Sequence, residues 1–315
     1  MRMEYQIIAA LALDLLIGDP RWFPHPVKLI GRFAVFLETP SRKFFQNPRI
    51  AGVAAVISVL TATGLITYLI TMTAGLLHPF IADAVSIILL YTTFAAKDLI
   101  KHSFDVYKGL KDGNLEEARK KVALLVGRDT DRLDETGVVR ATVESVAENT
   151  VDGVTAPLFF AVLAGPIGAM LYKAVNTLDS TFGYRNERYK EFGWAAARLD
   201  DIINFIPARL TGLLIPFAAF FVRLSPSNSF KIIFRDRKKH PSPNSGLAEA
   251  AVAGALGVQL GGLNYYFGQP AYREILGDPV RELDKKDILK TNALMFITLI
   301  LAAIVFLTVR LIIYL

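Results

Sequence analysis

Residues 51–77 form an unbroken apolar run, AGVAAVISVLTATGLITYLITMTAGLL, which is long enough to cross a lipid bilayer as a helix. A second apolar run, 79–96, is separated from it only by His78, so the pair is predicted to cross and return. With 53% hydrophobic residues the chain is too apolar for an ordinary soluble protein, yet 20% of its residues are charged. These features predict an all-α, polytopic integral membrane protein with substantial aqueous loops.

The remaining apolar segments are shorter or interrupted. Residues 291–313 form another good span, whereas 154–178 is broken by Gly165 and Pro166 and is expected to form two re-entrant half-helices. Three further segments are partial candidates: 202–224, which contains Pro207, Arg209 and Pro216; 247–263, which is rich in small residues; and 5–18, which contains Asp14. We expect three to five true spans within a single membrane-embedded domain, 1–315.

The charged segments predict the orientation of the chain. Residues 19–49 and 97–140 carry many Lys and Arg and are expected on the cytoplasmic side. The segment 97–150 is predicted to be amphipathic and helical, with a turn at 112–114 and Asn114 as a helix N-cap. The net charge of +6 is therefore attributed to cytoplasmic loops, not to nucleic-acid binding. The absence of cysteine excludes disulfides and thiolate metal sites.

An acidic row precedes the broken segment. Glu144, Glu148 and Asp152 are four residues apart, so a continuous helix would place them on one face, with Asn149 beside them. Like charges at this spacing repel one another. Two interpretations remain open: a Mg²⁺ site, since carboxylates with waters and phosphates form the usual shell of this ion, or a solvated helix face.

Three other stretches combine charged residues with unusual backbone chemistry. In 14–32, three prolines predict an extended, rigid path that carries His25, Lys28 and Arg32; the alternative is an interfacial loop. In 172–201, ionisable residues at membrane depth indicate a functional site, and the alternative is that the lysine side chain extends to the interface. In 235–254, a helix N-terminus could bind an anion, and the alternative is a simple helix cap after a basic loop. The candidate residues of these last two stretches are Lys173, Asn176, Asp179, Arg185, Arg188, His240, Asn244 and Ser245.

No G-x-x-x-x-G-K-[ST], G-x-G-x-x-G, H-E-x-x-H or G-x-S-x-G motif occurs in the chain. The residues alone predict a membrane-embedded site, on the cytoplasmic face, for Mg²⁺ and substrates that carry phosphate or carboxylate. A transporter with polar half-helices fits nearly as well. The acidic signature of CDP-alcohol transferases is incomplete, because VDGVTAP supplies only Asp-Gly.

Four long motifs resemble the adenosylcobinamide-phosphate synthase family of cobalamin biosynthesis. They are LDLLIGDPRWFPHPVKLIGR (13–32), GRDTDRLDETGVVRATVESVAENTVDGVTAPLFF (127–160), YKAVNTLDSTFGYRNERYKEFGWAAARLDDIINFIPARLT (172–211) and HPSPNSGLAEAAVAGALGVQLGG (240–262). The resemblance covers most of the chain, while 41–96 and 290–315 match only as hydrophobic segments.

This resemblance implies a multi-pass protein of the cell membrane that joins a corrin propionate of adenosylcobyric acid to 1-amino-2-propanol or its O-phosphate. ATP is the expected co-substrate and Mg²⁺ the expected cofactor, and enzymes of the later pathway steps are possible partners. The non-enzymatic alternative is a transporter or corrinoid-binding scaffold.

Matching residue chemistry to the family reaction gives each candidate a role. Mg²⁺ is assigned to Glu144, Glu148, Asp152 and Asp179, and Glu144 and Glu148 are also expected to be catalytic. Lys173, Arg185 and Arg188 are expected to neutralise the transferred phosphoryl group or the phosphate of the aminopropanol. The expected substrate-binding residues are His25, Lys28, Arg32, Asn149, Asn176, Arg188, His240, Asn244 and Ser245.

Overall fold

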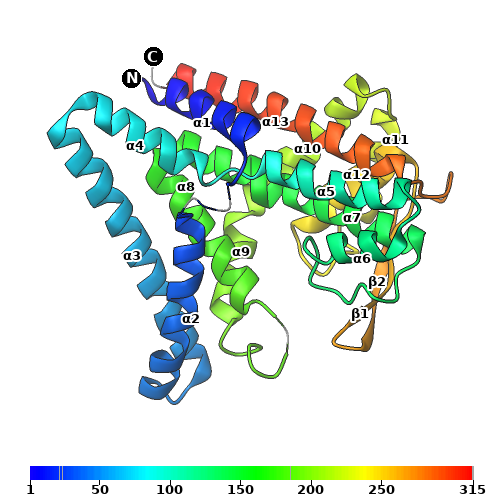
Figure 1. The fold of residues 1–315 in the computed structure, drawn as a ribbon, viewed down its shortest axis with the longest axis horizontal. Helices are drawn as coiled ribbons and strands as arrows, with labels where there is room; N and C mark the ends of the chain where they lie inside the picture. The colour runs from blue at the N-terminus through cyan, green and yellow to red at the C-terminus, as the bar shows by residue number, and fades with distance from the viewer. Residues whose placement is uncertain (21, 23, 185, 314–315) are drawn as a thin grey trace. The chain divides into compact units, whose positions relative to one another are not determined.

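The computed structural model describes residues 1–20, 22, 24–184 and 186–313, and the fold is helical apart from one short β-hairpin (Figure 1). Internal contacts divide the chain into two compact units. Unit 1 contains 1–95, 156–204 and 305–315, and unit 2 contains 96–155 and 205–304. The all-α class is confirmed, while the prediction of a single membrane-embedded domain stays a prediction.

Unit 1 is a bundle of apolar helices. Helices α3 and α4 form the predicted hairpin, because His78 breaks the helix and its imidazole Nδ1 caps the next one by accepting from the Phe80 amide (Figure 1). The helices of this unit are α1 (Met3–Ile17), α2 (Pro26–Phe44), α3 (Pro48–Leu77), α4 (Pro79–Tyr91), α8 (Ala156–Phe182) and α9 (Trp194–Ile203), with the end of α13 (Lys286–Ile313).

The expected break in the segment 154–178 is confirmed within α8. Ala164 and Gly165 leave the helical conformation, and Gly165 has a φ of 60°, which an L side chain rarely adopts. Pro166 follows at once and cannot donate a backbone hydrogen bond. The segment 202–224 is also divided, but between α9 and α10, at Asn204, which lies before its prolines.

The prediction of an extended path through 14–32 is wrong at both ends, because α1 continues to Ile17 and α2 begins at Pro26. Helix α2 begins at Pro26, so Lys28 and Arg32 lie on a regular helix, one turn apart. A proline is compatible with the first helical position, because the amide it lacks would have no partner there. His25 is the residue that precedes this helix.

Unit 2 contains the segments that carry the acidic row and the turn predicted at 112–114. The predicted turn at 112–114 is present, and Asn114 Oδ1 accepts from the Glu117 amide as the N-cap of α6. After α7 the chain changes from α to π geometry, so Asp152 does not continue the α-helical row of Glu144 and Glu148. The helices of this unit are α5 (Ala96–Lys111), α6 (Leu115–Val122), α7 (Glu135–Asn149), η1 (Thr150–Thr155), α10 (Phe205–Phe221), α11 (Pro226–Asp236), α12 (Ser245–Leu256) and most of α13.

The sequence made the apolar segment 247–263 a candidate for a partial span, but the structure shows that it is not one helix. Helix α12 ends at Leu256 because Gly257 adopts a left-handed conformation, with a φ of 70°. The chain then forms strands β1 (Leu260–Tyr266) and β2 (Gln269–Leu276), which pair antiparallel. Their turn residues, Phe267 and Gly268, both have positive φ, as a tight hairpin turn requires.

Four helical stretches of the described chain are long and apolar enough to cross a membrane, or five if α9 and α10 count as one span. This agrees with the predicted three to five spans. Most of the apolar surface of α3 and α13 is not covered by protein, as expected of helices that face lipid. The four stretches are Pro48–Leu77, Pro79–Lys111, Glu135–Phe182 and Lys286–Ile313.

Close backbone packing in unit 1 gives a first testable prediction. A Cβ at Gly52 would lie 1.9 Å from the carbonyl oxygen of Phe192, so Gly52→Ala should destabilise the protein by about 1–3 kcal/mol. Gly75→Ala in the same helix is the matched control, because a Cβ there meets nothing within 4 Å. Denaturant titration in mixed micelles measures both variants, and equal stability of the two would contradict the packing.

Candidate functional site

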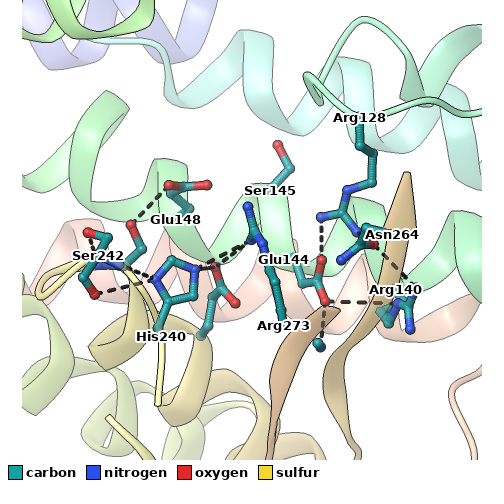
Figure 2. A network of polar contacts seen from close by, with 12 residues as sticks. Arg128, Arg140, Glu144, Ser145, Glu148, His240, Ser242, Asn264 and Arg273 are labelled. Carbon is teal, nitrogen blue, oxygen red and sulfur yellow. Dashed lines mark hydrogen bonds and ion pairs between the residues drawn. The ribbon is translucent and has the colours of Figure 1, made fainter. Parts of the chain in front are cut away.

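Helix α7 packs against α12 and β1 in unit 2, and charged side chains from five segments gather there (Figure 2). We call this group the α7–α12 polar cluster. It consists of Arg128, Arg140, Glu144, Glu148, His240, Glu249 and Arg273.

Glu144 organises one end of the cluster. Its side chain is only 2% exposed, and Arg128, from the loop before α7, donates to its Oε2. The Gly261 amide donates to Oε1 at 2.7 Å, and Arg140, one helical turn earlier, lies 4.0 Å from the same oxygen. Both carboxylate oxygens of Glu144 are therefore engaged within the protein. Asn264 contacts both arginines and accepts from Arg128 at 2.6 Å.

His240 and Glu249 form the other end. The Ser242 amide donates to His240 Nδ1 at 3.0 Å, and His240 Nε2 lies 3.4 Å from both Glu249 Oε1 and Arg273 Nη1. Burial and the charge of Arg273 lower the pKa of His240. Burial, followed by the charges of Glu144 and Glu148, raises the pKa of Glu249 well above its usual range. Both shifts favour the neutral form of each group.

Glu148 lies at the His240 end of the network, near Ser242, in Figure 2. Its Oε1 accepts from Ser245 Oγ, the first residue of α12, at 2.9 Å. Its Oε2 has no hydrogen-bond partner within the described residues, and the side chain is half-buried. Glu148 is thus the carboxylate of the cluster with an oxygen available for a ligand.

The charge balance of the cluster favours an anionic ligand. Three arginines and three carboxyl groups would be neutral if all were ionised. Burial raises the pKa of Glu249 and so favours its protonated form, which would remove one negative charge and leave one positive charge in excess. Arginine is well suited to this role, because its planar guanidinium group binds carboxylate and phosphate oxygens in pairs.

A cavity of about 550 Å³ adjoins the Arg140 end, which is a typical size for a small-molecule site. The Asp129 carboxylate shapes its rim by accepting from the amides of Phe267 and Gly268 at the hairpin turn. Its lining residues are Asp129, Asp131, Arg132, Leu133, Asp134, Thr136, Gly137, Arg140, Leu263, Tyr265 and Gly268.

Several predicted site residues of unit 2 do come together. Glu148 contacts Ser245, and His240 lies against Glu249 of the same helix as Ser245. Asn244 Oδ1 is 3.4 Å from Arg209 Nη1. Asn149 donates to the Ser145 carbonyl, one turn earlier in its own helix.

The other predicted residues lie in unit 1, in three places. His25 is 3.3 Å from Asp19, and Lys173 donates to Asn176 at 3.4 Å, near Asp179 and Asp200. Arg188, with Arg42, is held by the buried carboxylate of Glu38. Lys28 and Arg32 follow along α2, and Arg185 lies outside the described residues.

The predicted magnesium ligands do not form one preassembled set. Within the described chain, no group of three or more His, Asp or Glu side chains is arranged to hold a metal ion. Glu144 is committed to Arg128 and Gly261, and Asp179 belongs to unit 1. Mg²⁺ that arrives with nucleotide phosphates needs only one or two protein carboxylates, and Glu148 meets that smaller requirement.

The sequence analysis did not select Arg128, Arg140, Glu249 or Arg273. Arg140 could have been found, because it precedes Glu144 by four residues and can pair with it on a helix. Glu249 carried a signal as the one acid in an apolar helix. Arg128 and Arg273 join the cluster through contacts between distant segments, which spacing does not reveal.

Apolar spans and a buried network of ionisable groups define an α-helical, multi-pass membrane protein with a polar site. The model of the CobD/CbiB protein family matches residues 7–295, so the chain belongs to that family, whose role is in cobalamin biosynthesis.

Curated relatives agree over nearly their whole length. A cobalamin biosynthesis protein CobD of Leptospira interrogans is 46% identical over 311 residues, which is 98% of both chains. CobD of Clostridium perfringens is 47% identical over 306 residues, 97% of both chains. The cobalamin biosynthesis protein CbiB of Salmonella choleraesuis is 42% identical over 304 residues, 96% of this chain and 95% of its own. No solved structure matches the chain.

Proposed function

We propose that this protein is an ATP-dependent amide-forming ligase of the cell membrane, with its active site on the cytoplasmic face. It joins a propionate of adenosylcobyric acid to 1-amino-2-propanol or its O-phosphate, giving adenosylcobinamide or its phosphate. The observation that carries the proposal is the α7–α12 polar cluster, in a chain whose family acts in cobalamin biosynthesis.

The reaction requires activation, because a carboxylate and an amine do not condense in water. In the proposed route, a propionate oxygen attacks the γ-phosphorus of ATP and releases ADP, forming an acyl phosphate. The free amine then attacks the acyl carbon, the C–O bond to phosphate breaks, and phosphate leaves. Mg²⁺, when bound with ATP, would neutralise charge on the phosphates.

The chain's own residues supply the other requirements. The positive excess of Arg128, Arg140 and Arg273 favours a propionate or phosphate anion, since fixed cations stabilise developing charge in a water-poor site. Glu148 is the proposed base for the ammonium proton and the proposed carboxylate toward Mg²⁺. Glu144 is assigned the role of holding the arginines in place.

A direct assay tests the proposal. Purified protein in detergent is incubated with adenosylcobyric acid, Mg-ATP and either amine, and corrinoid mass is followed. We expect the corrinoid mass to increase by the amount that one amide linkage to the amine adds, with one ADP released per product. The amine that gives the higher rate is the true substrate. Omission of ATP or chelation of Mg²⁺ should abolish product. Corrinoid that binds without reacting under all conditions would instead favour a scaffold or transporter.

A further inference from the structure

Arg209 and Arg237, outside the polar cluster, have no acidic partner among the described residues. Arg209 of α10 and Arg237, the residue after α11, are close enough for their charges to act on one another. Within the described chain neither forms an ion pair, and the buried Nε of Arg237 has no hydrogen-bond partner. A partly buried pair of like charges is unfavourable unless an anion compensates it.

The neighbouring acids are already occupied. Asp236 pairs with Arg235 and with Lys239, at 2.7 Å each, and its Oδ2 also accepts from the Gly277 amide. Asp278 pairs with Arg235 and Lys231. The basic run 235–239 is thus divided: its outer cations neutralise acids, while Arg237 is left without a counterion among the described residues.

The Arg209 side chain and the Arg237 backbone lie at the start of α12. Arg209 Nη1 is 3.4 Å from Asn244 Oδ1, and the Arg209 guanidinium stacks on the Phe205 ring, 3.3 Å from its centroid. A Cβ at Gly246 would lie 2.6 Å from the Arg237 carbonyl oxygen, so the chain around Arg237 packs directly on the first turn of α12. The positive end of a helix dipole adds to the two cations.

We propose that Arg209 and Arg237, at the N-terminus of α12, form a binding site for a phosphate group. Two guanidinium groups match the oxygens of a phosphate, and Ser245 links this place to Glu148 of the polar cluster. A phosphate bound here therefore lies beside the proposed reaction centre. Its assignment to a reactant of the ligation rests on the proposed function, whereas the anion site itself does not.

The binding test uses inorganic phosphate and protein in a neutral detergent, with equilibrium dialysis as the readout. Arg237→Gln should weaken phosphate binding by about tenfold or more, since a charge-assisted contact is lost, and Arg237→Lys should retain part of it. Lys238→Gln is the matched control, an exposed cation in the same run. Equal phosphate binding by the wild type and the three variants would overturn the site. Absence of binding by every protein, both in this test and in the lipid comparison that follows, would also overturn it.

A second arm distinguishes two sources of phosphate. Protein in nanodiscs of phosphatidylcholine, with and without phosphatidylglycerol, is compared for thermal stability. Stabilisation by phosphatidylglycerol that Arg237→Gln removes, without any binding of inorganic phosphate, would support a lipid headgroup site and overturn the assignment to a reactant. If phosphate binds as expected but no amide forms in the ligation assay, the anion site stands and the proposed ligase fails.

The kinetic form of the test identifies the reactant. Arg237→Gln should raise KM about tenfold or more for 1-amino-2-propanol O-phosphate, with little change in KM for the unphosphorylated amine. A rise in KM for ATP alone would overturn the amine as the source and support the nucleotide. Unchanged KM values for all substrates would overturn any reactant as the source.

Discussion

Replacing Arg128 with methionine is expected to destabilise the protein by about 3–5 kcal/mol, because the buried carboxylate of Glu144 then loses its closest cation and keeps only the longer contact to Arg140. Arg128 also donates to Asn264 at 2.6 Å, so the same change leaves a second buried group without its donor. Unfolding by denaturant titration in mixed micelles measures the loss. Arg132→Met is the matched control, an exposed arginine of the same segment, and should change stability by less than about 0.5 kcal/mol.

A double variant separates the ion pair from simple packing. In Arg128→Met with Glu144→Gln, the buried charge is removed, while the glutamine oxygen still accepts from the Gly261 amide. The double variant should therefore be more stable than Arg128→Met alone by about 1–3 kcal/mol. If the two changes simply add, Glu144 is not held by Arg128, and the arrangement of the cluster described above is wrong.

The membrane architecture was predictable because its signals are local. The His78 break depends on one residue between two apolar runs, and the Gly165 break depends on a Gly-Pro pair. Asn114 could be predicted as a cap because a cap needs only the amides that follow it. Pro26 was expected to prevent a helix, but it begins α2, because a proline is compatible with the first helical position.

The site was predictable only in part, because its pairing depends on contacts distant in sequence. Glu144 and Glu148 look equivalent in the sequence, four residues apart on one helix. The structure separates them: Glu144 accepts from Gly261, 117 residues away, whereas Glu148 meets the first residue of α12. The β-hairpin that supplies Gly261 and Arg273 was not predicted, since its glycines interrupt the alternating pattern of a strand.

Glu148→Gln is expected to lower kcat/KM for amide formation by about 10²–10³-fold, because the cluster then loses its one carboxylate with an oxygen available to substrate or Mg²⁺. Glu144 is engaged at both oxygens, and the raised pKa of Glu249 favours its neutral form, so neither is suited to replace Glu148. Glutamine retains the acceptor for Ser245 Oγ, so the fold should be preserved.

The ligation assay with a Mg²⁺ titration measures the effect of Glu148→Gln. A role toward Mg²⁺ predicts that the variant needs a higher Mg²⁺ concentration for half-maximal rate, whereas a role as base alone predicts a lower rate with the same Mg²⁺ dependence. Glu116→Gln is the control, since Glu116 is exposed and pairs only with Lys120 on the surface of α6. Unchanged rate and unchanged Mg²⁺ dependence in Glu148→Gln would place the chemistry outside the α7–α12 polar cluster.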